Sequence, residues 1–462
     1  MENKILGPVL SWHSDQPKLQ QATIGPCRDP LLKKLSTAPL KKWLGVFAGY
    51  SGVQCLVQAT GYLSGILIIH ALDKREYAIY TIAGSMLGAL NLLSDVGVSS
   101  ALTAVGGRIY DNNTRLGRLL GSALRFRQRL AAVAASIGLP VFGWMLLKNE
   151  TTVAFLFLVM APVLVTCYWQ LHYQVYLVVL KLRTQVYKLQ KLDIYGSAAR
   201  LLLLLLLLST YPNVIGCLLI AAITASFQLR MLKGWIQSEI TVDSESTEFA
   251  SEISSSVKQL LASVIFYLLQ GQLAIVLISI FGKTENIAEI GALSRLAAIF
   301  SILGAIISNI IAPRYARYSA PESLRSRFLQ MAASSILLGS VLTVLAISFP
   351  SQLLLLLGPQ YKNLVKEVSL MVGVASLTFA TASMWSLNLS KGWTKGAWIQ
   401  IPTTVLVQIV LLCILDFSQV SGILWFNLIS TIPFFGLQFW LWRNGLKTSI
   451  KNAGHFVIEN TG

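Results

Sequence analysis

Residues 257–281, VKQLLASVIFYLLQGQLAIVLISIF, carry a single charged side chain, Lys258, at the start of a long apolar run. A helix of about 20 apolar residues crosses the hydrocarbon core of a bilayer. Comparable runs recur along nearly the whole chain, so the sequence predicts an all-α polytopic membrane protein. About twelve helices are expected, at 44–70, 76–102, 128–147, 152–178, 192–209, 213–232, 257–281, 287–312, 328–349, 364–389, 395–415 and 420–441.

The composition excludes several other classes of protein. Of the 462 residues, 54% are hydrophobic and 12% are charged, whereas soluble domains carry about 25% charged residues. The net charge is +17, but the Lys and Arg residues lie in short clusters between apolar runs, which is typical of topology signals and not of a nucleic-acid surface. The five cysteines are scattered singly, so neither a disulfide framework nor a metal site is expected.

The Lys and Arg residues also predict an orientation. Cytoplasmic loops of membrane proteins carry an excess of these residues. With a cytoplasmic N-terminus, 29 of the 37 Lys and Arg residues fall on the cytoplasmic side and 6 on the other. We therefore expect a protein of the cytoplasmic (inner) membrane with both termini in the cytoplasm.

The long acidic connection before Lys258 divides the chain into six helices plus six. The helix pair 44–70 and 76–102 recurs in layout as 257–281 and 287–312. Both pairs begin with an odd-numbered helix, so the two repeats cross the membrane in the same direction and are parallel. The expected domains are a basic tail (1–43), an N-terminal lobe (44–232), an acidic linker (233–256), a C-terminal lobe (257–441) and a second tail (442–462).

Among the charged residues inside the expected helices, three stand out, namely Asp95, Arg200 and Arg295. Such residues are costly in a membrane and are hypotheses of function by default. For Arg295 and Arg200 the sequence leaves two interpretations open, a cation in a water-filled cavity that holds an anionic substrate, or a structural pair. Asp95 lies near the inner end of its helix, where an ion pair with a loop arginine is the simpler interpretation.

Polar side chains follow one face of several expected helices. Small residues share these stripes and also mark close helix packing, so cavity lining and packing both remain open. The further cavity candidates are Gln54, Gln58, Asn91, Gln270, Gln272 and Asn309.

Two stretches resemble a known family. Glu76-Tyr77-Ala78-Ile79-Tyr80 followed by Leu92-Leu93-Ser94-Asp95-Val96-Gly97-Val98-Ser99-Ser100-Ala101-Leu102, and Leu356-Leu357-Gly358-Pro359-Gln360-Tyr361, are similar to motifs of polysaccharide-transport proteins. These are the Wzx-type O-antigen and exopolysaccharide flippases of the multidrug/oligosaccharidyl-lipid/polysaccharide exporter (MOP) superfamily.

The resemblance implies two six-helix lobes around a central cavity, and export of an undecaprenyl-pyrophosphate-linked glycan from the inner to the outer leaflet. It implies that Arg295 and Arg200 supply cations to the substrate, and that a glycan polymerase and other assembly proteins are partners. No cofactor is expected, and coupling to H⁺ or Na⁺ is left open. One alternative is a cation-coupled multidrug antiporter with Asp95 as the coupling carboxylate. The other, a membrane glycan polymerase or ligase, is disfavoured by the short outer loops, so no enzyme activity is expected.

Overall fold

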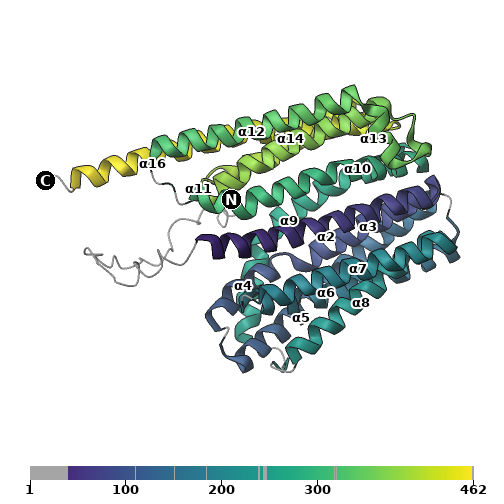
Figure 1. Cartoon of the computed structure of the whole chain (residues 1–462), viewed down its shortest axis with the longest axis horizontal. Helices are drawn as coiled ribbons and strands as arrows, with labels where there is room; N and C mark the ends of the chain where they lie inside the picture. The colour runs from purple at the N-terminus through teal and green to yellow at the C-terminus, as the bar shows by residue number, and fades with distance from the viewer. Residues whose placement is uncertain are drawn as a thin grey trace, which may run out of the picture. The chain divides into compact units, whose positions relative to one another are not determined.

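The computed structural model describes residues 40–459, apart from 110, 150, 184, 238–239, 243–246, 317 and 319. Residues 1–51 and 52–462 separate into two compact units. In the first unit the described residues belong to the start of helix α2 (Leu40–Ala71), so most of the expected tail over 1–43 lies outside the described residues. In the second unit the described residues form helices and turns without a strand, and Figure 1 shows the long helices side by side.

Within the described residues, twelve helices are long and apolar enough to cross a membrane. This confirms the predicted number, and the chain is a multi-pass membrane protein. After α2 they are α3 (Lys74–Asp95), α5 (Asn113–Lys148), α6 (Val153–Leu182), α7 (Val186–Thr210), α8 (Val214–Gln237), α9 (Thr247–Phe281), α10 (Thr284–Ile306), α12 (Pro321–Ser348), α14 (Val365–Ser390), α15 (Gln400–Ile414) and α16 (Val420–Glu459). The short elements are α4 (Val98–Ile109), the π-helix η1 (Ile307–Ile311), α11 (Ala312–Ala316), α13 (Pro350–Leu357) and the 3₁₀ turns η2 (Pro359–Tyr361) and η3 (Ala397–Ile399).

The single helix expected over 76–102 is wrong, because α3 ends at Asp95 and α4 begins at Val98. Gly97 has φ +81°, a left-handed conformation that favours glycine. The Asp95 carboxylate accepts hydrogen bonds from the Ser99 backbone N–H (3.0 Å) and hydroxyl (2.7 Å). Asp95 thereby caps the first turn of α4, as short polar side chains do at helix N-termini.

The third expected helix, 128–147, begins much earlier, at Asn113. The Asn112 side chain accepts from the Arg115 N–H at 3.0 Å and caps α5. The arginines between residues 115 and 129 therefore lie on a helix and not in a loop. One of them, Arg127, is only 2% exposed.

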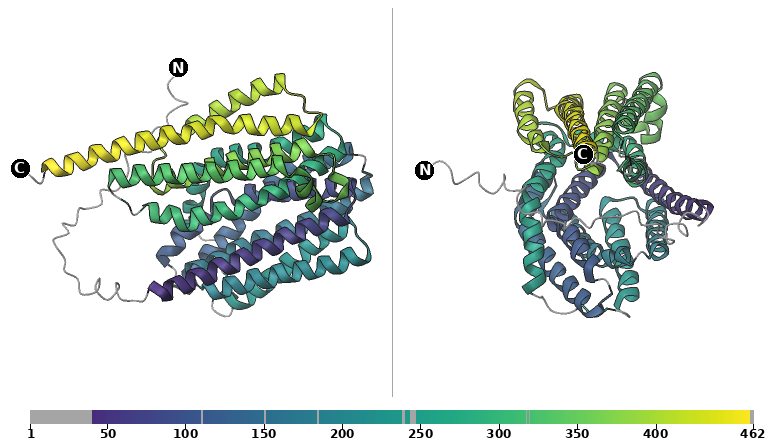
Figure 2. Two further views of the ribbon diagram at one scale, coloured as in Figure 1. Left: turned by 45° about the horizontal axis from the view of Figure 1, so that its top comes forward. Right: turned by 90° about the vertical axis from the view of Figure 1, so that its left-hand side faces the viewer.

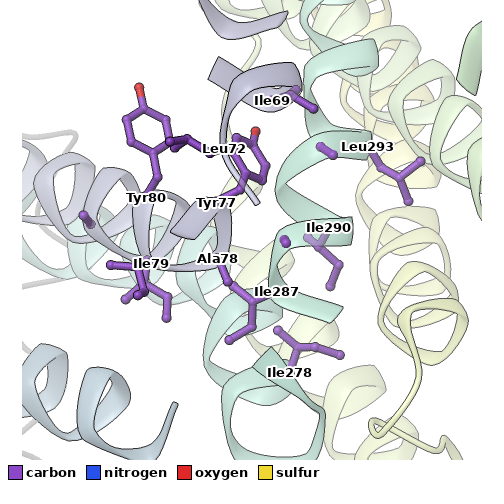
Figure 3. Packing of buried hydrophobic residues seen from close by; sticks show 14 of the residues in the cluster. Ile69, Leu72, Tyr77, Ala78, Ile79, Tyr80, Ile278, Ile287, Ile290 and Leu293 are labelled. Atoms are coloured by element: carbon purple, nitrogen blue, oxygen red, sulfur yellow. The ribbon is translucent and has the colours of Figure 1, made fainter. Parts of the chain in front are cut away.

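The helices pack as two groups that meet through α3, α4 and α5 of the first half and α9 and α10 of the second. In the N-terminal half α6 contacts α5 and α8, and α7 contacts α8, while in the C-terminal half α14 contacts α12 and α16, and α15 contacts α16. The two views of Figure 2 show α16, in yellow, running beside the other C-terminal helices. Between the halves, α3 contacts α9 and α10. Tyr77, Ala78, Ile287 and Ile290 belong to one buried cluster at this junction (Figure 3).

The expected linker over 233–256 is partly helical, since α9 begins at Thr247. Phe249, Ile253 and Val257 on this first part of α9 are buried in a cluster with residues of α4 and α5. The first helix of the C-terminal lobe therefore also packs against the N-terminal lobe. At the other end of the chain, α16 continues to Glu459 and takes in most of the tail expected over 442–462.

A π-helical turn follows α10, where a regular helix was expected to continue to 312. A proline has no backbone N–H and disfavours a regular α-helix in the turn before it, and Pro313 follows this π-turn in the sequence. Asn309 lies within this π-turn. The side chain of Asn309 itself lies outside the described residues.

Candidate substrate pathway

Arg295 on α10 is half-buried and lies against two elements of the N-terminal half. Its Nε donates to the Tyr77 hydroxyl on α3 at 3.4 Å. On α2, a Cβ added to Gly65 would lie 3.4 Å from the guanidinium Nη1 of Arg295. Because Gly65 has no side chain, the space beside it is available to the Arg295 side chain.

Arg200 on α7 makes the equivalent contact with the next tyrosine of the same helix. Its Nη2 donates to the Tyr80 hydroxyl at 3.3 Å. The rings of Tyr77 and Tyr80 stack at 6.0 Å between centroids, and in Figure 3 both hydroxyls point to the same side of α3. We call Arg295, Tyr77, Tyr80 and Arg200 the arginine–tyrosine row.

Both arginines of the row keep their charge unneutralised by carboxylates. Within the described residues, neither guanidinium forms an ion pair, and the hydrogen bonds they make go to neutral phenols. The row joins α10, α3 and α7, which belong to both halves of the chain. It is a site to which an anion can bind with bidentate, charge-assisted hydrogen bonds.

A cavity of about 240 Å³ lies beside Arg200, between α2, α6, α7 and α8. We call it the N-lobe chamber; Asp193 and Arg200 both line it. Gln54 on α2 donates to the Asp193 carboxylate at 3.0 Å. This chamber brings a carboxylate, an amide and a guanidinium into one part of the membrane interior.

The C-terminal half contains a cavity of about 620 Å³ between α9, α14, α15 and α16, which we call the C-lobe chamber. Gln270, one of the predicted residues, lines it together with Gln408. The two amides exchange hydrogen bonds of 2.9 and 2.6 Å. Sequence reasoning missed most of this chamber, although Gln400, Thr404 and Gln408 recur every four residues and share one face of α15.

The halves meet at the end of the bundle that carries the α2–α3 turn (72–73) and the α9–α10 turn (282–283), which we call the turn end. Lys74 and Glu289 form an ion pair of 2.8 Å there. Gln360 donates to the Ile69 and Leu72 carbonyls at the end of α2, at 2.9 and 3.2 Å. Burial, followed by the nearby Tyr77 phenol and Glu289 carboxylate, raises the pKa of Tyr361, which stays neutral in this core.

The remaining predicted residues occupy different surroundings. Asn91 donates to Gln170 on α6 at 2.6 Å, and Gln272 accepts from Ser85 on α3 at 2.5 Å, so both join neighbouring helices. Gln58 is exposed. For these residues a role in lining the pathway stays a prediction.

Asp95 pairs with an arginine, as the simpler interpretation predicts, but this arginine lies on a helix and not in a loop. Its carboxylate lies 3.8 Å from the Arg127 guanidinium on α5. The sequence did not single out Arg127, because its position seemed to fall in a loop. Nε and Nη1 of this arginine are buried without a hydrogen-bond partner in the described structure. Within the described residues, no three His, Cys, Asp or Glu side chains are placed to hold a metal ion.

Comparisons with known proteins identify the fold. No family model and no curated protein matches the chain, but many solved structures do. An inward-facing multidrug resistance MATE family transporter of the MOP superfamily matches with a TM-score of 0.65 at 13% identity, covering 86% of this chain and 96% of that one. The eukaryotic MATE transporter AtDTX14 matches with a TM-score of 0.58 at 15% identity, covering 88% and 97%.

A MOP superfamily transporter from Pyrococcus furiosus, for which reversed polarity of the binding pocket suggests a different function, matches with a TM-score of 0.57. Its identity is 14%, over 86% of this chain and 94% of that one. Identities this low establish the fold alone. The chain has the two-lobe, all-α fold of MATE and other MOP transporters.

Proposed function

We propose that this protein flips a lipid-linked oligosaccharide or polysaccharide precursor across the cytoplasmic membrane by alternating access. The observation that carries the proposal is the arginine–tyrosine row. Two arginines held by phenols, with no carboxylate paired to them in the described structure, favour an anionic group in the membrane interior. The pyrophosphate of an undecaprenyl-linked glycan supplies such a group, while its prenyl tail stays in the lipid.

The turn end supports alternating access. There the ion pair of Lys74 with Glu289 and the Gln360 contacts to α2 join the two halves. In the proposed orientation, with both termini in the cytoplasm, the turn end faces outward. The proposed cycle loads the glycan from the cytoplasm with the turn end closed and then releases it when these contacts break. A glycan polymerase is the proposed partner on the outer side.

The test is translocation in proteoliposomes that contain the purified full-length protein. The probe is a polyprenyl-pyrophosphate-linked disaccharide with a fluorophore, whose outer-leaflet fraction is measured with a membrane-impermeant quencher. We expect the protein to accelerate translocation, and Arg295→Ala and Arg200→Ala each to slow it about tenfold or more, since hydrogen bonds to charged groups contribute about 1.5–3 kcal/mol. Arg295→Lys should retain part of the translocation rate, because lysine keeps the positive charge but lacks the planar set of N–H donors of the guanidinium.

Arg230→Ala is the matched control, because Arg230 is an exposed arginine on α8 in the same half. It should translocate the probe at the normal rate. If the two row variants fold normally and move the probe as fast as the unchanged protein, the proposal is wrong.

A second candidate function, the cation-coupled multidrug antiporter, is favoured by one observation. The Asp193 carboxylate lies in the N-lobe chamber with a single described hydrogen bond, from Gln54, and a carboxylate in such a place can exchange H⁺ or Na⁺. Asp95 is less suited to this task, since it pairs with Arg127 and caps α4. The test is dye uptake driven by a proton or sodium gradient. If the protein takes up dye, if Asp193→Asn abolishes this uptake, and if the glycan probe is not translocated, the antiporter proposal replaces the flippase proposal.

A further inference from the structure

The two chambers occupy equivalent places in the two halves. The N-lobe chamber lies among the first, fourth, fifth and sixth spans, and the C-lobe chamber among the seventh, tenth, eleventh and twelfth. The same arrangement of four helices therefore forms both. Their chemistry differs, because the N-lobe chamber is lined by Asp193 and Arg200, whereas the described lining of the C-lobe chamber contains no charged side chain.

The C-lobe chamber nonetheless contains several polar groups. Thr404 on α15 and Ser430 on α16 are 4% and 9% exposed, and within the described structure neither hydroxyl has a hydrogen-bond partner. Gln270, Gln408 and Asn427 add amide groups, which both donate and accept. Buried polar groups are almost always hydrogen-bonded in native proteins, so two unpartnered hydroxyls in one cavity point to a ligand that pairs with them.

The chamber also contains aromatic surface. Trp385 and Phe434 line it with ring centroids 5.9 Å apart, and Tyr267 lines it beside Gln400. Flat apolar faces beside neutral groups that donate and accept match a pyranose ring, whose C–H faces are apolar and whose hydroxyls both donate and accept. A charged ligand would be left there without a counter-charge from the described residues, which is costly in a low-dielectric interior. The volume of about 620 Å³ is typical of a small-molecule site.

We propose that the C-lobe chamber binds an uncharged sugar unit of the transported glycan. This inference rests on the proposed function for its biological substrate, but the binding itself can be measured without transport. The arginine–tyrosine row would then hold the pyrophosphate, and Thr404 and Ser430 would select the neutral sugar.

The binding experiment uses the full-length protein in nanodiscs, purified without sugar-based detergents. Maltotriose and chitotriose are the neutral probes, and a trisaccharide of galacturonic acid is the charged comparison. We expect the neutral probes to change the tryptophan fluorescence, and Trp385→Phe to remove that change. Thr404→Val with Ser430→Ala should weaken binding at least about tenfold. These substitutions should leave folding intact, because neither hydroxyl has a partner within the described structure.

Thr403→Val is the matched control. Thr403 precedes Thr404 on α15, and its hydroxyl donates within its own helix to the Ile399 and Gln400 carbonyls. It should bind the neutral probes as the unchanged protein does. The inference is overturned if no neutral probe binds up to millimolar concentrations, if the charged probe binds equally well, or if the double variant binds sugars normally. The inference is also overturned if the unchanged protein binds sodium but no sugar, and the double variant loses the sodium binding.

The transport assay separates this inference from the proposed function. If neutral sugars bind through Thr404 and Ser430 but the protein does not translocate the lipid-linked probe, the chamber stands and the flippase proposal falls. The opposite result is also informative. If the protein translocates the probe, and the double variant translocates it at the normal rate and with the same preference among attached sugars, the flippase proposal is supported and the chamber inference is wrong.

Discussion

Among the described residues, the buried Arg127 and the half-buried Arg295 and Arg200 differ in their partners. Arg127 pairs with the Asp95 carboxylate, so much of its charge is compensated and a structural role suffices to explain it. Arg295 and Arg200 instead donate hydrogen bonds to the phenol oxygens of Tyr77 and Tyr80. Phenols satisfy donors but leave the positive charge in place, which is why we assign substrate binding to these two and not to Arg127.

The structural role of Arg127 can be tested with Asp95→Asn. We expect this change to lower the free energy of unfolding by about 1–3 kcal/mol, below the roughly 3–5 kcal/mol of a fully buried pair, because the Asp95 side chain is 35% exposed. Thermal unfolding in detergent measures the loss. Asp95→Asn with Arg127→Met should recover most of it, since no buried charge then remains. Equal instability of the single and double variants would contradict the assignment.

Hydropathy was sufficient to predict the spans, but not the places where helices break or begin. The apolar sequence resumes after Asp95 with Val96 and Val98, so hydropathy does not separate α3 from α4; the positive φ of Gly97 and the Asp95 cap mark the break. The early start of α5 was hidden for the opposite reason, because its arginines seemed to belong to a loop. Pairs such as Arg200 with Tyr80 join helices distant in the sequence, and no local pattern contains them.

Gly97→Ala tests the helix break between α3 and α4. A Cβ at this position would lie 2.6 Å from the Leu260 Cδ1 on α9, in a backbone conformation that L side chains rarely adopt. We expect a loss of about 1–3 kcal/mol in the free energy of unfolding, seen as a lower unfolding temperature. Gly84→Ala is the control, because nothing lies within 4 Å of its added Cβ. A loss in Gly84→Ala as large as that in Gly97→Ala would contradict this explanation.

At the scale of the whole molecule, the two lobes have a similar arrangement of helices but different interiors. One lobe places charge in its chamber and the other places neutral amides and hydroxyls in the equivalent position. The sequence predicted the two halves from their layout. It did not predict the chambers, because each collects its lining residues from four separate spans.

The turn end offers a test of movement between the halves. Glu289→Lys places two cations together, so we expect the contact with Lys74 to break and the turn end to separate. Spin labels are attached at positions 211 and 362, where Tyr211 and Lys362 are both exposed, in a protein whose native cysteines have been replaced. Pulsed electron paramagnetic resonance then measures the distance between the two labels. The swap Lys74→Glu with Glu289→Lys should return the distance distribution to that of the unchanged protein. A distribution that Glu289→Lys leaves unaltered would contradict a closing role for the pair.

The contact of Gln360 with the end of α2 gives the transport cycle a label-free reporter. The last turn of α2 is held from outside, by a side chain of the other half that binds the Ile69 and Leu72 carbonyls. Separation of the halves removes this support and leaves the turn free to fray. Amide hydrogen exchange near Leu72 should then speed up whenever the protein opens at this end, so the proposed transport cycle can be followed through the intermittent unfolding of one helical turn.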